Sequence, residues 1–268
     1  MRNHSIRQLY LLVGLLFLFS PNLTVARIVL GSPSISIIID DIGYRIHEDL
    51  RAIALPGSIA YAIMPHSPNA QLMSRLASKR GKVILLHLPM ESIWEEKNRF
   101  LGPGALTLNM THDQFMRTLV GDLRSIPDAV GVNNHMGSLL TQHPGNMGWL
   151  MDTLKKNKKF YIDSVTSTQS VAGTVAGEKK IPYLRRDVFL DNHQNEAYIQ
   201  AQFEELIKIA KQKGHAIAIG HPYPETLQVL SIKLQQLDEY GVVLVNLVDM
   251  VDRQNEARKI RHTLLSHK

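Results

Sequence analysis

The stretch Ile37-Ile38-Ile39-Asp40-Asp41 joins a run of β-branched apolar residues to two adjacent carboxylates. Such apolar runs are typical of buried strands. Four later apolar runs also end in polar residues that can do chemistry, and these residues are His87, Asn133-Asn134-His135, Asp163-Ser164 and His221. The carboxyl ends of parallel strands lie on one face of an α/β fold, where such folds build their active sites. The pattern therefore predicts a parallel sheet with a functional site at that face.

Short apolar runs alternate with amphipathic segments along the chain. The predicted strands are Ser34–Asp40, Ser58–Met64, Lys82–His87, Ala129–Asn134, Lys159–Asp163, Asp187–Asp191, His215–Gly220 and Val242–Asn246. The predicted helices are Ser67–Ser78, one that opens at the capping box Thr111–Gln114, Asn195–Lys213, Glu225–Tyr240, and a charged terminal helix or frayed tail over Asp252–Lys268. This order indicates a single-domain deformed (β/α) barrel with seven to eight mostly parallel strands. An open doubly wound sheet is less favoured because no glycine-rich phosphate loop follows the first strand.

The composition removes several classes of function. The chain has 268 residues, of which 44% are hydrophobic and 20% are charged, and it contains no cysteine. A disulfide scaffold, a thiolate zinc site and a cysteine nucleophile are therefore excluded. The formal net charge is +6, but the basic residues are scattered and aromatic residues make up only 6%. We therefore expect no nucleic-acid partner.

The first 26 residues have the layout of a secretory signal peptide. Arg2 and Arg7 precede the apolar run from Leu9 to Phe19, and the small-residue exit Thr24-Val25-Ala26 follows it. This run is shorter than the roughly 20 residues that span a bilayer, although an uncleaved anchor is the alternative interpretation. We expect an exported, periplasmic protein without a stable membrane span after cleavage. Its mature domain would cover residues 27–268, with a core from about residue 34 to residue 249.

The two adjacent carboxylates constrain the chemistry. Neighbouring residues on a regular strand point to opposite faces, so Asp40 and Asp41 would have different roles unless the strand ends there. One would bind a metal ion while the other holds or deprotonates a water molecule. Histidines from other strands would complete the site, and carboxylate with imidazole suits zinc without excluding other divalent ions. Each histidine alone is more often structural, but together with the two aspartates they favour a metal site.

Five segments also occur in the order of a known family. They are Ser36–Gly43, Leu86–Glu91, Asn133–Ser138, Asp163-Ser164 and Gly220–Pro222. Together they resemble the divergent polysaccharide deacetylase family, bacterial exported proteins related to the NodB-like carbohydrate esterases. The resemblance implies a deformed (β/α) barrel. It also implies metal-dependent removal of acetyl groups from a sugar polymer, with peptidoglycan as one such polymer.

The resemblance assigns roles to particular residues. Asp40 would be the general base and His221 the general acid. One divalent metal ion, with zinc preferred, would be bound by Asp41, His87 and His135. Ordinary members take two metal histidines from one His-x-x-x-His motif, but here Glu91 follows His87 at that spacing and is the reserve ligand. The expected supporting or substrate-binding residues are Glu91, Asn134, Ser138 and Asp163.

Several alternatives remain open from the residues alone. For Asn134, a clamp on the neighbouring loop and a contact to substrate are equally good interpretations. Trp94 and Trp149 could stack on sugars, although Trp149 lies in a helical pattern and suits a core as well. The missing second histidine supports an inactive barrel that binds a glycan or an envelope protein as a regulatory module. A different metal amidohydrolase, such as a peptidase, is the third interpretation.

Overall fold

The computed structural model describes residues 31–266, so the expected signal peptide, residues 1–26, lies outside the described part. Its strands all pair in parallel. They are β1 (Ser34–Ile42), β2 (Ala60–Ile63), β3 (Val83–Met90), β4 (Gly131–Met136), β5 (Phe160–Asp163), β6 (Tyr183–Arg185), β7 (Val188–Phe189), β8 (His215–Gly220) and β9 (Val243–Leu244). They follow the order β6-β5-β4-β3-β2-β1-β8-β7, and β9 pairs with the start of β1. The predicted deformed (β/α) barrel is confirmed.

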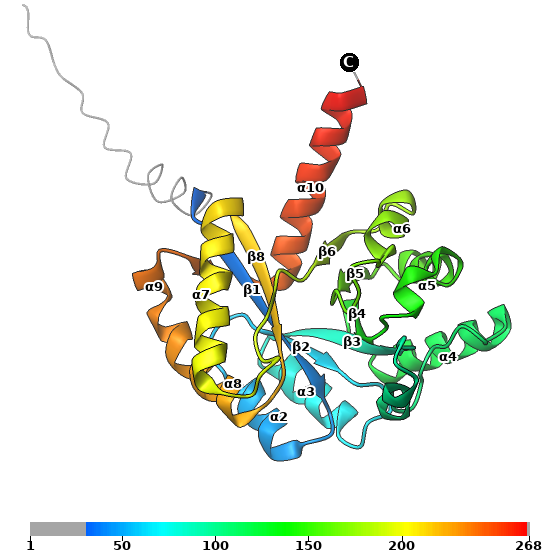
Figure 1. The fold of residues 1–268 in the computed structure, drawn as a ribbon, viewed down its shortest axis with the longest axis horizontal. Coiled ribbons are helices and arrows are strands. Elements are labelled where there is room, and N and C mark those ends of the chain that lie inside the picture. Colours follow the sequence, from blue (N-terminus) through cyan, green and yellow to red (C-terminus); the bar gives the residue numbers. More distant parts are fainter. Residues whose placement is uncertain (1–30, 267–268) are drawn as a thin grey trace, which may run out of the picture. The chain divides into compact units, whose positions relative to one another are not determined.

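Helices connect the strands and surround them (Figure 1). They are α2 (Ile46–Ile53), α3 (Ala70–Lys79), α4 (His112–Ser125), α5 (Pro144–Lys156), α6 (Ala172–Glu178), α7 (Glu196–Lys213), α8 (Pro224–Lys233), α9 (Leu237–Tyr240) and α10 (Leu247–Ser266). Short 3-10 turns are η1 (Glu95–Phe100), η2 (Leu140–Gln142) and η3 (Leu234–Gln236). Within residues 31–266, none of these helices combines the length and the apolar composition needed to cross a membrane.

Local signals place several helix ends where the sequence predicts them. The Thr111 side chain accepts a hydrogen bond from the Gln114 N–H, and the Gln114 side chain accepts one from the Thr111 N–H, so α4 begins with a complete capping box. The side chain of Asn195 caps α7, which ends at Gly214 with φ +84°. A glycine tolerates this left-handed conformation and stops the helix.

Other boundaries differ from the prediction. The helix expected over Glu225–Tyr240 is divided into α8, η3 and α9. The predicted strand Asp187–Asp191 is reduced to β7. The aspartates at its two predicted ends use their side chains to accept backbone N–H groups in β8 and just after it. Asp187 Oδ2 accepts the Ile217 N–H, and Asp191 Oδ2 accepts the His221 N–H. The three-residue β6 was not predicted, because so short a strand carries no readable alternation. The terminal helix α10 begins at Leu247 rather than at residue 252.

The central strands β1, β2, β3 and β5 are buried on both faces, as expected for a parallel sheet covered by helices. Along β1, Ile37 and Ile39 belong to the apolar cluster that includes residues of the outer helices. Ile38 points the other way and belongs to a second cluster, which includes Ile217 from β8 and Leu247 from α10. Leu247 therefore helps to fill the interior of the barrel from the first turn of α10. This packing fixes the strands whose carboxyl ends carry the polar residues.

The barrel is open between β6 and β7. These two strands end the path of paired strands, and no ladder joins them within residues 31–266. Helix α10 runs beside β6 and then extends beyond the strands (Figure 1). Its Arg258 guanidinium donates a hydrogen bond to the backbone carbonyl of Tyr183 on β6. Arg258 of α10 thus binds a backbone carbonyl at the open edge of β6.

Candidate active site

A β-bulge at the end of β1 brings both carboxylates to one site. The register with β2 shifts between Ile39 and Ile42, and Asp41 has the left-handed φ of +58°. Bulges re-aim side chains in this way and break the regular alternation of a strand. Asp41 Oδ1 lies 3.2 Å from His87 Nε2, and Asp40 Oδ2 lies 3.5 Å from the same nitrogen. Although β1 continues to Ile42, the two aspartates therefore reach the same imidazole.

Asp41, His87 and His135 form a group that could hold a metal ion. Their potential ligand atoms all lie within 4.8 Å of one another. His135 Nδ1 lies 3.0 Å from Asp41 Oδ1 and 3.2 Å from His87 Nε2. Asp41 Oδ1 is buried, yet it has no hydrogen bond of acceptable geometry among the described residues. Such a convergence of imidazole and carboxylate atoms fits a divalent cation, and His and Asp are ordinary zinc ligands.

Asn133 joins this group to Asp40. Its Nδ2 donates a hydrogen bond to Asp40 Oδ1 at 2.8 Å, and its Oδ1 lies 2.9 Å from His87 Nδ1. The amide NH₂ must face the carboxylate, so Oδ1 faces the imidazole and Nδ1 must carry the hydrogen. In the neutral imidazole the lone pair then lies on Nε2, the nitrogen directed toward Asp41, as a metal ligand requires. Asn133 was noted from the sequence as a polar residue at a strand end, but no role was predicted for it.

Burial and neighbouring charges shift the pKa values of the two carboxylates in opposite directions. Burial raises the pKa of Asp40 above its ordinary value of 3.8, and the opposing attraction of His87 and His221 is too weak to reverse this. Burial also acts to raise the pKa of Asp41, but the adjacent imidazoles of His135 and His87 hold it well below 3.8. Asp41 is thus the carboxylate better suited to a cation, while Asp40 is better suited to holding a proton.

His221 follows β8 and is held by a buried carboxylate. Its Nδ1 lies 2.9 Å from Asp191 Oδ1, while Asp191 Oδ2 accepts hydrogen bonds from the His221 N–H and from Thr226 Oγ1. Burial opposes protonation of the imidazole, but the hydrogen bond to Asp191 and the charge of Asp41 raise its pKa to about 9. His221 Nε2 lies 3.7 Å from Asp41 Oδ2, so a protonated imidazole faces the site. Asp191 was missed because it was interpreted only as the end of a strand.

Asn134 clamps the loops around the site. Its Oδ1 accepts hydrogen bonds from the Tyr161 hydroxyl at 3.0 Å and from the Ser164 N–H at 2.9 Å. Its Nδ2 donates to the Met136 carbonyl at 2.7 Å, next to the turn where Met136 has φ +53°. These bonds match the clamp interpretation and leave the amide occupied by protein groups.

The other predicted supporting residues also hold loops. Glu91 Oε2 accepts the Leu108 N–H at 2.7 Å, so this carboxylate anchors the long loop before α4 and is not part of the Asp41 group. Asp163 accepts the Val165 N–H through Oδ1 and the Ser170 hydroxyl through Oδ2. The hydroxyl of Ser138 lies 3.0 Å from that of Ser92 and accepts the Ile93 N–H. Whether Asn134, Glu91, Ser138 or Asp163 also contacts a substrate stays a prediction.

Aromatic and cationic side chains lie beside this site. The Arg45 guanidinium lies 5.0 Å from the centre of the Tyr223 ring, and that ring lies 5.4 Å from the His221 ring. Trp94, in the loop tied to Ser138, is 59% exposed. Trp149 instead packs edge to face against Phe115 at the helix α4–α5 contact. Of the two tryptophans, Trp94 is therefore the one available to a ligand.

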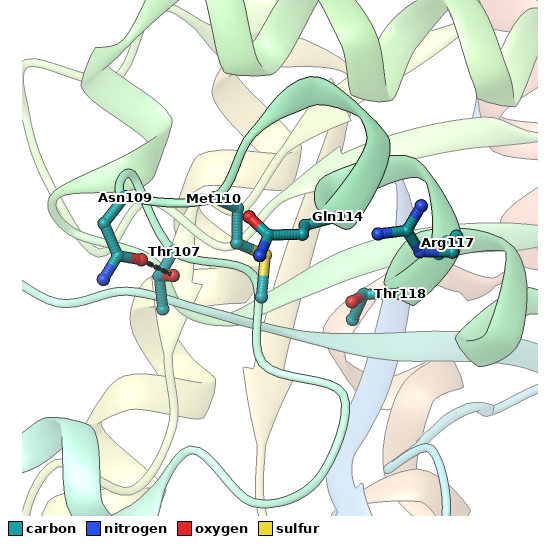
Figure 2. A pocket seen from close by; sticks show the side chains of 6 residues that line it. All are labelled: Thr107, Asn109, Met110, Gln114, Arg117 and Thr118. Carbon is teal, nitrogen blue, oxygen red and sulfur yellow. Dashed lines mark hydrogen bonds between the residues drawn. The ribbon is translucent and has the colours of Figure 1, made fainter.

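A separate surface pocket of about 400 Å³ lies at the start of α4 (Figure 2). Its lining residues are Thr107, Asn109, Met110, Gln114, Arg117 and Thr118. These side chains include neither a carboxylate nor an imidazole, so the pocket offers no acid–base pair and no ordinary metal set. The chemistry of this molecule is better sought at the strand ends.

The fold and the site together define a parallel (β/α) barrel with imidazole and carboxylate groups gathered at the carboxyl ends of its strands. The family described as divergent polysaccharide deacetylase matches residues 37–251, and the chain belongs to this family. The resemblance seen in the five sequence segments is thereby confirmed.

Relatives extend the comparison. The uncharacterized protein YibQ of Escherichia coli K12 is 37% identical over 209 residues, which cover 76% of this chain and 65% of YibQ, less than two thirds of its length. An uncharacterized protein of Haemophilus influenzae Rd is 39% identical over 205 residues, covering 76% of this chain and 72% of that protein. The crystal structure of an uncharacterized protein from Agrobacterium tumefaciens C58 has a TM-score of 0.78 at 23% identity, over 82% of this chain and 89% of that chain. This last likeness shows the shared fold.

Proposed function

We propose that this protein is an exported, metal-dependent hydrolase that removes acetyl groups from an N-acetylated polysaccharide of the cell envelope. The observation that carries the proposal is the convergence of Asp41, His87 and His135 beside Asp40 and His221. The family of the chain supports the reaction class and the carbohydrate substrate. Peptidoglycan is the first polymer to test because it is an N-acetylated polymer of the envelope.

The metal ion would be held by Asp41, His87 and His135, with zinc as the proposed ion. A bound divalent ion supplies Lewis acidity, which polarises the acetyl carbonyl and favours deprotonation of water. Asp40 is the general base that takes the proton from the attacking water, and the Asn133 amide holds one oxygen of this carboxylate. The new carbon–oxygen bond forms as this proton leaves the water.

His221 is the general acid in this scheme. Its raised pKa keeps the imidazole protonated at neutral pH, and Asp191 orients the ring through Nδ1. The proton on Nε2 goes to the sugar nitrogen as the carbon–nitrogen bond breaks. Water is thereby consumed, and the products are acetate and an amino sugar.

The proposed export rests on residues 1–26, which combine two arginines, an apolar run and a small-residue exit. Periplasmic localisation follows from such a leader in a bacterium with two membranes. A fusion of residues 1–26 to a reporter that is active only outside the cytoplasm tests this part alone. An active reporter supports export, and an inactive reporter that is present at normal levels contradicts it.

Acetate release tests the enzymatic part. The purified protein is treated with a chelator, loaded with zinc, manganese, nickel or cobalt, and mixed with N-acetylated glucosamine oligomers or peptidoglycan fragments. We expect acetate release with wild type and a loss of at least about a hundredfold for Asp40→Asn, since general base catalysis is typically worth that much. Asp113→Asn is the matched control, because Asp113 lies on the exposed first turn of α4. No release with any metal or substrate contradicts the proposal.

A second function is an inactive barrel that binds glycans as a regulatory module. The exposed Trp94 and the commitment of the Glu91 carboxylate to the Leu108 N–H favour this alternative. It predicts that the same oligosaccharides bind without releasing acetate, and that Trp94→Ala weakens this binding while Asp40→Asn does not.

A further inference from the structure

The open seam of the barrel contains a cavity that is distinct from the site described above. Its volume is about 480 Å³. Its walls come from β6 and the Arg186-Asp187 segment that follows it, from Lys213 at the end of α7, from the start of β8, and from α10. None of Asp40, Asp41, His87, His135 or His221 lines it. It lies at the open seam, where β6 and β7 end the path of paired strands.

Arginines in this cavity are held by neutral groups. The Arg258 guanidinium lies 4.2 Å from the centre of the Tyr183 ring and donates to the Tyr183 carbonyl. Arg186 donates through Nε to the Ser164 carbonyl at 2.7 Å and through Nη2 to the Val165 carbonyl at 3.0 Å. None of these partners carries a negative charge. Both guanidinium groups are therefore fixed in place by neutral acceptors. Arg186 is also attracted by the carboxylates of Asp163, Asp40 and Asp187. The ring and the carbonyl that Arg258 contacts are both neutral.

The remaining charges of the lining do not balance these arginines. Asp187 is the carboxylate in the lining, and it already binds Lys213 Nζ and the Ile217 N–H, each at 2.9 Å. Arg185 is exposed, and its ion pair with the buried Asp163 is long, with 3.9 Å between Nε and Oδ2. Cations thus outnumber carboxylates around a space that is partly shielded from water.

We propose that this seam cavity binds a compact oxyanion with two or more negative charges, of the phosphate ester or pyrophosphate class. Planar guanidinium groups that are already oriented match the oxygens of a phosphate and lose little freedom on binding. A cavity of this volume also has room for a small group attached to the phosphate. The bound anion would then link β6, β8 and α10 across the seam.

Calorimetric titration of the full chain, freed of metal by a chelator and kept at low ionic strength, tests the proposal. The probes are inorganic phosphate, pyrophosphate, a sugar phosphate and acetate. We expect pyrophosphate and phosphate to bind and acetate to give no measurable heat. Binding of the sugar phosphate in addition shows room for the attached group, whereas its failure beside bound phosphate overturns the ester part of the proposal.

Variants locate the bound anion. Arg258→Gln should weaken pyrophosphate binding by about tenfold or more, as expected for a lost hydrogen bond to a charged group. Arg185→Gln should also weaken it, and this exposed side chain can be changed without disturbing α10. Arg253→Gln is the matched control, because Arg253 is an exposed arginine of α10 outside the lining. Circular dichroism checks that each variant is folded. If Arg258→Gln does not fold, the affinity of Arg185→Gln decides the outcome.

Three results would overturn the proposal. The first is an absence of heat with both phosphate and pyrophosphate. The second is an equal loss of affinity in Arg253→Gln, which would show a diffuse charge effect. The third is a loss of affinity in His221→Ala with no change in the seam variants, which would place the anion at the strand-end site. Because the protein is free of metal and no acetylated sugar is used, failure here is independent of the proposed deacetylase activity.

Discussion

The carboxylate of Asp40 and the imidazole of His87 come from different strands and are joined through a single amide, that of Asn133. One amide therefore orients both the proposed base and a proposed metal ligand. The arrangement is buried, so neither Asp40 Oδ1 nor His87 Nδ1 can exchange this partner for water. The precision of the site thus depends on a residue that has no chemistry of its own.

Replacing this amide should weaken both the fold and the binding of the metal ion. Asn133→Leu keeps a similar volume but leaves two buried polar atoms unpaired, at a cost of about 1–3 kcal/mol for each. We also expect zinc affinity to fall by about 10–100-fold, because the His87 tautomer is no longer held. Competition with a fluorescent chelator measures the affinity, and urea unfolding measures the stability. Asn192→Leu, at an exposed position, is the control. Unchanged zinc affinity in Asn133→Leu would contradict the orienting role.

Asp191 should set the alkaline limit of activity. His221 must be protonated to act as the acid, so activity should fall as the pH rises through its pKa of about 9. Asp191→Asn removes the charge that raises this pKa while keeping a similar shape. We therefore expect the alkaline limb of the kcat profile to move to lower pH. A profile whose alkaline limb does not move in Asp191→Asn would argue against His221 as the acid.

The buried carboxyl group of Asp122 should make the stability depend on pH. Burial raises the pKa of Asp122 from 3.8 to about 8. Its Oδ1 lies 2.9 Å from His66 Nε2, and its Oδ2 has no hydrogen-bond partner in the described part of the chain. A carboxyl whose pKa is raised by folding stabilises the folded state below its unfolded pKa. This stability is lost as the pH rises from about 4 through about 8.

Asp122→Asn should remove this dependence. Relative to the variant, wild type should lose free energy of unfolding between pH 5 and pH 9, because only the wild-type side chain must ionise in a buried place. Urea unfolding at several pH values measures the difference. Asp128→Asn, which changes a partly exposed carboxylate near the end of α4, serves as the comparison. Parallel stability curves for wild type and Asp122→Asn would show that Asp122 is ionised throughout.

Patterns in the chain predicted the barrel and the grouping of its polar residues well, because parallel strands place their carboxyl ends on one face. The capping box at Thr111 and the stop at Gly214 were also predicted, because each depends only on residues that are close in sequence. The bulge at Asp41 was not predictable, because it depends on the register between β1 and β2. The pairing of Asp191 with His221 joins residues that are 30 positions apart, and such contacts carry no periodic signal.

The same limit explains the supporting residues. Asn134 was selected because it stands beside His135, and Glu91 because it follows His87 at the spacing of the paired-histidine motif. Their side chains instead bond to the backbone of loops whose paths the sequence does not reveal. Asn133 stands at the same strand end and is more central, since its partners lie on β1 and β3. Sequence position alone cannot separate these neighbouring amides.

Metal analysis of purified wild-type protein beside single-site variants tests the central claim most directly. The variants are Asp41→Asn, His87→Ala and His135→Ala, with His47→Ala as the control at an exposed histidine of α2. We predict one equivalent of zinc in wild type and in His47→Ala, and a loss of bound zinc in each of the other three after dialysis. Equal zinc content in all five proteins, or none in wild type after zinc loading, would contradict the metal site.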